Sequence, residues 1–213
     1  MSGDAEGPRS RAEAFNCASH LVGAGLAAAG VVPLVVLAAR GADPWRVAGV
    51  AVFGTTLVAL YSISSAYHGL RGRLKDVFRR LDHTAIYLLI AGTWTPFSLG
   101  PLRDPWGLGL LGLVWALAAL GIALALLRSR PPRWLPAGLG LLMGWLGLLA
   151  LPGLARALPG TALAGIVAGG LLYTGGVVFY ALDRRLAFGH GVFHVLVMGG
   201  SVAHYCVVLL YVA

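Results

Sequence analysis

The stretch 189-GHGVFHVLVMGGSVAHY-205 places two histidines, His190 and His194, four residues apart in a run that is apolar enough to lie in a membrane. On a helix, residues four apart lie on the same face, one turn above the other. Two imidazoles arranged in this way can bind one metal ion together. Ionisable side chains inside a membrane span are costly, so the pair indicates a functional site.

The composition is that of a membrane protein. The 213-residue chain is 58% hydrophobic and 11% charged, and its mean hydropathy is +0.82, whereas a soluble domain carries about 25% charged residues. We therefore expect a multi-pass protein of the cell (plasma or inner) membrane with no additional soluble domain. The net charge of +8 does not indicate nucleic-acid binding, because no basic helix with interleaved aromatic residues is present.

Seven segments are long and apolar enough to cross a bilayer, for which about 20 residues are needed. They cover residues 15–39, 46–68, 82–100, 106–127, 134–152, 161–182 and 190–212. The fifth is the weakest, because it is short and ends at Pro152-Gly153. The prediction is an all-α fold, in which residues 1–14 form a short cytoplasmic N-terminal segment without a cleavable signal peptide. Residues 15–213 then form a single seven-helix transmembrane domain.

The orientation follows from the basic residues, which are enriched on the cytoplasmic side of membrane proteins. Twelve of the 16 Lys and Arg residues fall on the side of the N-terminus. They are Arg9, Arg11, Arg71, Arg73, Lys75, Arg79, Arg80, Arg128, Arg130, Arg133, Arg184 and Arg185, against Arg40, Arg46, Arg103 and Arg156 on the other side. We therefore place the N-terminus in the cytoplasm and the C-terminus outside.

With this topology, three spans bring histidines and a carboxylate to the same leaflet at similar depth. His68 ends the second span, Asp82 begins the third, and the histidine pair begins the seventh. Three neutral imidazoles and one open position describe a catalytic zinc site. The predicted Zn²⁺ ligands are His68, His190 and His194. Asp82 would hold or deprotonate a water molecule, or support a ligand, and Ser64 would stabilise charge on a carbonyl oxygen.

Each of these residues also has a simpler interpretation. His68 would be an interfacial histidine at the end of its helix, and the pair of the seventh span would carry no metal. Asp82 would form an ion pair with Arg79, Arg80 or a lipid-facing lysine. Ser64 and its neighbour Ser65 would be helix-packing residues or bond to their own backbone. These interpretations weaken when the residues are taken together, because all of them must coincide at one depth.

Five further polar residues lie close to these positions in the sequence. His83 follows Asp82 and is expected to face away from it, because neighbours on a helix point about 100° apart. His204 lies deeper in the seventh span, where it would line a cavity or form a hydrogen bond between helices. Glu13, Asn16 and His20 open the first span, and we expect them to lie in the headgroup zone rather than against the site.

At these residues the chain resembles the bacterial hemolysin III family, which is related to the progestin and adipoQ receptors and more distantly to the alkaline ceramidases. The resemblance rests on SSAYH (64–68), FRRLDHTAIYLLIAGTWTPF (78–97), GHGVFH (189–194) and GSVAHY (200–205). It implies seven helices, a cytoplasmic N-terminus and a zinc near the cytoplasmic face. The receptors' three zinc-binding histidines match the predicted ligands, their serine matches Ser64, and their aspartate matches Asp82.

The chain also departs from the receptors, which tend to carry tyrosine at the position of His83. It has neither a long cytoplasmic N-terminal domain nor a large extracellular loop, so the resemblance does not imply hormone binding. The expected function is a zinc-dependent intramembrane hydrolase of lipid amides or esters, similar to the ceramidases. A pore-forming cytolysin, and a receptor or sensor with structural zinc, stay open as alternatives. The expected partner is a membrane lipid, as substrate or ligand, and a homo-oligomer is compatible with this expectation.

Overall fold

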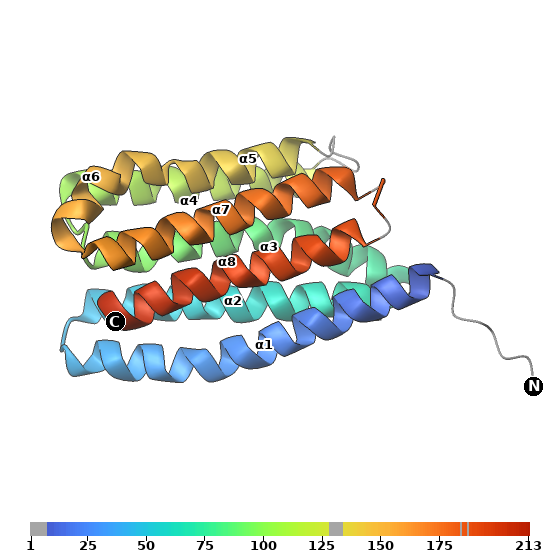
Figure 1. The fold of residues 1–213 in the computed structure, drawn as a ribbon, viewed down its shortest axis with the longest axis horizontal. Helices are drawn as coiled ribbons and strands as arrows, with labels where there is room; N and C mark the ends of the chain where they lie inside the picture. Colours follow the sequence, from blue (N-terminus) through green and yellow to red (C-terminus); the bar gives the residue numbers. More distant parts are fainter. Residues whose placement is uncertain (1–7, 128–133, 184, 187) are drawn as a thin grey trace, which may run out of the picture.

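The computed structural model describes residues 8–127, 134–183, 185–186 and 188–213, and these ranges contain helices and no strand. The helices are α1 (Pro8–Arg40), α2 (Pro44–Gly69), α3 (Gly72–Leu99), α4 (Pro105–Leu127), α5 (Trp134–Trp145), α6 (Gly147–Ala157), α7 (Gly160–Leu182) and α8 (Gly189–Tyr211). They lie side by side along one direction, and α1 begins at the end of the bundle opposite to the end of α8 (Figure 1). The all-α prediction is confirmed.

The fifth predicted span consists of two helices, α5 and α6, which together form one apolar rod from Trp134 to Ala157. The helix is interrupted at Leu146, whereas Pro152, where the sequence predicted the end, lies inside α6. Two indole N–H groups donate to carbonyl oxygens beside the interruption: Trp94 to Met143 at 3.2 Å and Trp106 to Leu149 at 3.3 Å. Neighbouring helices thus supply hydrogen bonds to backbone carbonyl groups, which lipid chains cannot supply.

Six helical segments are long and apolar enough to span a membrane: Arg11–Arg40, Pro44–Gly69, Pro105–Leu127, Trp134–Ala157, Gly160–Leu182 and Gly189–Tyr211. The seventh, α3, does not meet this criterion on its own. Its first turns carry the charged residues of 72–80, and its second half contains buried threonines such as Thr93 and Thr95. Because α3 contacts α2, α4, α5 and α8, protein rather than lipid surrounds much of its surface, and a helix in that place can be more polar.

Helix α1 begins at Pro8, seven residues before the predicted start of the first span. The extra turns carry Glu13 beyond the apolar run and across the end of α2. Residues 1–7 of the predicted N-terminal segment lie outside the described residues, as do Arg128, Arg130, Arg133 and Arg184 from the count of basic residues.

Helices α2 and α3 approach each other closely because glycines lie at their contact. A Cβ atom at Gly49 would lie 2.9 Å from Cα of Pro96, and one at Gly92 would overlap the Thr56 side chain. This close packing fixes α3 against α2, and therefore fixes Asp82 relative to Ser64 at the cytoplasmic end of the pair.

We expect Gly92→Ala to lower the free energy of unfolding by about 1–3 kcal/mol, because the added methyl group has no space beside Thr56. The measurement is the midpoint of unfolding in detergent. Gly112→Ala in α4 is the matched control, because a Cβ atom there would meet nothing within 4 Å. An equal midpoint for the two variants would contradict the close packing.

Candidate metal centre

The structure brings the three predicted ligands together at one end of the bundle. His68 lies near the end of α2, and His190 and His194 lie in the first turns of α8. One ligand atom from each residue lies within 4.8 Å of the others. His68 is 6% exposed and His194 is 1% exposed, so the bundle encloses these two residues, whereas the His190 side chain is 31% exposed. The interpretation of His68 as an isolated interfacial histidine is therefore wrong.

Carboxylates orient two of the three imidazoles. Nδ1–H of His68 donates to Oε2 of Glu13 at 3.0 Å, and Nζ of Lys75 donates to the same oxygen at 2.9 Å. Oδ2 of Asp183 lies 3.6 Å from Nδ1 of His190. A carboxylate on one ring nitrogen fixes the tautomer of a histidine and directs the other nitrogen towards a metal.

The nitrogen atoms that face the centre fit a metal site. Nε2 of His68 and Nδ1 of His194 are buried, and neither has a hydrogen-bond partner among the residues that the structure describes. The ring of His194 is also held by a hydrogen bond to the backbone of Asn16. A buried nitrogen without a partner costs free energy, which a coordinated ion would offset. Three imidazoles without a thiolate are a donor set that suits Zn²⁺.

Helix α1 supplies a fourth histidine that the sequence analysis placed elsewhere. His20 is 3% exposed, and its ring stacks on that of His194 with centroids 3.7 Å apart and an interplanar angle of 16°. Asn16 is buried as well, and Glu13 contacts His68. The prediction that these three residues lie in the headgroup zone is wrong, because α1 continues past its apolar run and packs against α2 and α8.

Glycine in α8 makes this approach of α1 feasible. A Cβ atom at Gly191 would lie 3.0 Å from the ring of Phe15 and 3.4 Å from Oδ1 of Asn16. The first turn of α1 beyond the apolar run therefore lies directly against the turn of α8 that carries the histidine pair.

Asp82 and Ser64 lie on the same cavity as His190 and His194. The Ser64 hydroxyl donates a hydrogen bond to the Asp82 carboxylate. Of the two arginines considered as partners of Asp82, Arg79 lies 3.5 Å from Asp76 instead. The helix-packing interpretation applies to the neighbouring serine, because Oγ of Ser65 donates to the carbonyl oxygen of Cys17 at 3.0 Å.

His83 and His204 also line this cavity. The expectation that His83 points away from the predicted ligands stays a prediction. For His204, both predicted roles are present, because its Nε2–H donates to the carbonyl oxygen of Ile166 on α7 at 3.1 Å while the ring borders the cavity.

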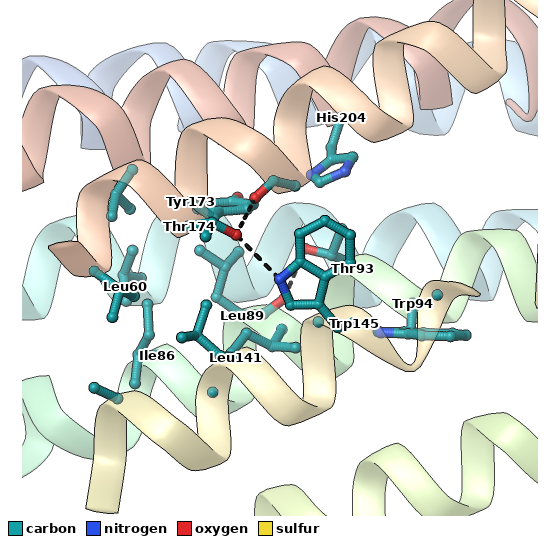
Figure 2. Close-up of a pocket in the computed structure, with 18 of the residues that line it drawn as sticks. Leu60, Ile86, Leu89, Thr93, Trp94, Leu141, Trp145, Tyr173, Thr174 and His204 are labelled. Carbon is teal, nitrogen blue, oxygen red and sulfur yellow. Dashed lines mark hydrogen bonds between the residues drawn. The ribbon is translucent and has the colours of Figure 1, made fainter. Parts of the chain in front are cut away.

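The cavity has a volume of about 280 Å³ and extends from the histidine cluster into the interior of the bundle. Its walls come from α1, α2, α3, α5, α6, α7 and α8, and most of the lining side chains are apolar, such as Leu89 and Leu141 (Figure 2). Nε1–H of Trp145 donates to Oγ1 of Thr174 at 3.1 Å and so joins α5 to α7 beside the cavity. Leu148, which is 57% exposed on the outer surface, also borders the cavity.

Residues 9–205 match the family described as Haemolysin-III related. The chain belongs to this family. It is 36% identical to the "Hemolysin-3 homolog" of Bacillus subtilis over 200 residues, which cover 93% of each chain. It is 36% identical to "Hemolysin-3" of Bacillus cereus over 205 residues, 94% of this chain and 91% of that protein. The human "Monocyte to macrophage differentiation factor" is 26% identical over 208 residues, 93% of this chain and 83% of that protein.

The haemolysin-III-related region contains every residue of the histidine cluster, together with carboxylates whose role the sequence analysis missed. Asp183 was not considered, and Glu13 was placed away from the site. A signal was available, because the chain has only eight Asp and Glu residues. Three of them lie at the cytoplasmic ends of helices. Glu13 is in α1 and Asp82 is in α3, which both carry a histidine, and Asp183 follows α7 just before the helix of the histidine pair. In so apolar a chain, acidic residues at those ends indicate partners for the histidines.

We expect Glu13→Gln to weaken Zn²⁺ binding by about 10- to 100-fold, because the His68 imidazole loses the carboxylate that orients it. The measurement is competition for zinc between the purified protein and a chromophoric chelator. Asp76→Asn is the matched control on the same face of the membrane, because the Asp76 side chain is 72% exposed and contacts Arg79 rather than a histidine. Equal zinc affinities for the two variants would rule out the supporting role of Glu13.

Proposed function

We propose that this haemolysin-III-related membrane protein is a zinc-dependent hydrolase that cleaves lipid amides or esters within the membrane. The observation that carries the proposal is the position of the three-histidine cluster at the end of an apolar cavity that Asp82 and Ser64 also line. Such an arrangement places hydrolytic groups beside a space that suits an acyl chain.

His68, His190 and His194 would hold the ion. Bound Zn²⁺ with three imidazole ligands lowers the pKa of a coordinated water to about 7 and polarises a carbonyl group. Glu13 would keep the His68 ring oriented by accepting a hydrogen bond from its Nδ1–H. Asp183, which faces Nδ1 of His190, would do the same for that ring. His20, stacked on His194, would limit the rotation of that ring.

Asp82 would act as the general base, and Ser64 would orient it. In the structure, the serine hydroxyl donates to the Asp82 carboxylate. When the carboxylate takes up a proton, it becomes the donor in this hydrogen bond and the serine oxygen becomes the acceptor. The Ser64 hydroxyl can then donate a hydrogen bond to the negatively charged oxygen that develops on the substrate carbonyl.

The substrate class follows from the cavity. An acyl chain would lie along the apolar walls, while the amide or ester group would lie beside the histidines at the cytoplasmic leaflet. A lipid of the inner leaflet has its carbonyl groups at this depth. Ceramide, which has an amide-linked acyl chain, is the first substrate to test.

We expect the purified protein in liposomes to release fatty acid from ceramide or from a matched ester lipid, measured by mass spectrometry. Asp82→Asn should lower turnover by about 10²- to 10⁴-fold, the usual contribution of a general base, while zinc content stays unchanged. Full turnover in Asp82→Asn would contradict the assigned role.

Two adjacent serines provide a matched control. Ser64→Ala removes the hydroxyl that contacts Asp82 and should lower turnover. Ser65→Ala removes a hydroxyl that contacts the Cys17 carbonyl, and should leave turnover unchanged. If both variants behave alike, Ser64 contributes to packing rather than to the reaction.

A second candidate function, cytolysis, is favoured by the names of the two bacterial relatives, "Hemolysin-3 homolog" and "Hemolysin-3". Its test is the release of haemoglobin from red cells by the purified protein and by His194→Ala. Equal lysis by both would favour a pore that does not need the histidine cluster. Zinc that stabilises the protein without turnover of any lipid tested would instead favour a receptor or sensor.

A further inference from the structure

A second polar cluster borders the cavity, deeper in the bundle than the histidine cluster. It consists of Tyr61 on α2, Tyr173 on α7, and Ser201 and His204 on α8. Of these, Tyr173 and His204 line the cavity. His204 follows His194 by ten residues on one helix, which corresponds to about 15 Å along its axis. The hydrocarbon core of a bilayer is about 30 Å thick, so this second cluster lies near the middle of the membrane.

The three hydroxyl groups of this cluster form two hydrogen bonds with one another, so one O–H donor is left over. Tyr61 donates to Oγ of Ser201 at 2.7 Å, and the hydroxyls of Ser201 and Tyr173 are 2.8 Å apart. These two bonds use two of the three hydroxyl protons. When Ser201 donates to Tyr173, the remaining proton is that of the Tyr173 phenol. Tyr173 lines the cavity, so this donor can reach a bound molecule.

His204 provides an acceptor beside this donor. Its Nε2 contacts the carbonyl oxygen of Ile166, which can only accept, so Nε2 carries the proton and Nδ1 has a free lone pair. The residue is 7% exposed, and Nδ1 is buried without a partner in the described part of the chain. The imidazole ring stacks with the Tyr173 ring at 5.5 Å and 27°. A Cβ atom at Gly169 would lie 2.8 Å from the imidazole, so the glycine makes room for it.

We propose that Tyr173 and His204 bind a hydroxyl group midway along the acyl chain of a lipid in the cavity. A hydroxyl can accept from the Tyr173 phenol and donate to Nδ1 of His204 at the same time, and it would satisfy both groups. A carbonyl group could only accept and would leave Nδ1 without a partner, and a saturated chain would leave both groups without one. The inference rests on the proposed function, because it assumes that the lipid's carbonyl end lies at the histidine cluster, and it narrows the substrate class to lipids with a hydroxylated chain.

The test compares two probes, a long-chain fatty acid with a single mid-chain hydroxyl and the same acid without it. Their dissociation constants are measured on detergent-purified, zinc-loaded protein by displacement of a fluorescent fatty acid. We expect the hydroxylated acid to bind about three- to tenfold more tightly, the effect of one or two additional hydrogen bonds after desolvation. Tyr173→Phe and His204→Leu should each reduce or remove this preference while the unsubstituted acid still binds.

Thr93→Val is the matched control, because Thr93 lines the same cavity and its hydroxyl donates to the Leu89 carbonyl oxygen of its own helix rather than to the proposed subsite. It should keep the preference. Equal binding of the two acids to the wild type, as expected if a buried water already satisfies both groups, would overturn the proposal. A preference that persists undiminished in both Tyr173→Phe and His204→Leu would overturn it as well.

The binding measurement separates this proposal from the proposed function. A preference for the hydroxylated acid in a protein that hydrolyses no lipid would support the subsite and contradict the hydrolase. Turnover of ceramide by a protein that binds both acids equally would support the hydrolase and contradict the subsite. Binding of the unsubstituted acid reports in both cases that the cavity of each variant is intact.

Discussion

A histidine nitrogen buried in a membrane bundle needs a partner, and this requirement governs the arrangement of the helices around the site. Water is absent from the hydrocarbon core, so each ring nitrogen must meet a protein group or a ligand. Nδ1 of His68 meets Glu13, and the ring of His194 meets the backbone of Asn16. Among the buried ring nitrogens that have no partner in the described part of the chain, Nε2 of His68 and Nδ1 of His194 belong to the three residues that converge on one point.

Two features of the helix packing make this convergence feasible. Helix α1 extends past its apolar run, so that Glu13 reaches His68, while Asn16 and His20 within the run lie against α8, where Gly191 provides the space. Helix α3 is too polar to count as a membrane span on composition alone, yet it contacts four other helices. The threonines of its second half are buried, and Asp82 lines the cavity beside Ser64.

Much of the fold and the histidine cluster could be predicted from the sequence, because both depend on simple regularities. Hydropathy located the seven spans, although α1 and α3 begin seven and ten residues before the predicted starts. The four-residue spacing of His190 and His194, with His68 at the same depth, indicated the cluster. The contact of His20 with His194 could not be predicted, since hydropathy reports contact with lipid and not contact between helices, whereas the scarcity of acidic residues was an available signal for Glu13. The interruption at Leu146 was missed for a similar reason, because indoles from other helices stabilise it. Asp183 lies just after α7, where no helical spacing relates it to His190.

The most direct test of this account is the metal content of the purified protein, measured by elemental analysis beside the double variant His190→Ala/His194→Ala. The account predicts about one zinc per wild-type chain, as one site with three imidazole ligands requires, and none in the double variant that still inserts into the membrane. Folded wild-type protein purified without chelators that holds no metal would contradict it. The histidines would then be buried hydrogen-bonding groups of a pore or a signalling bundle.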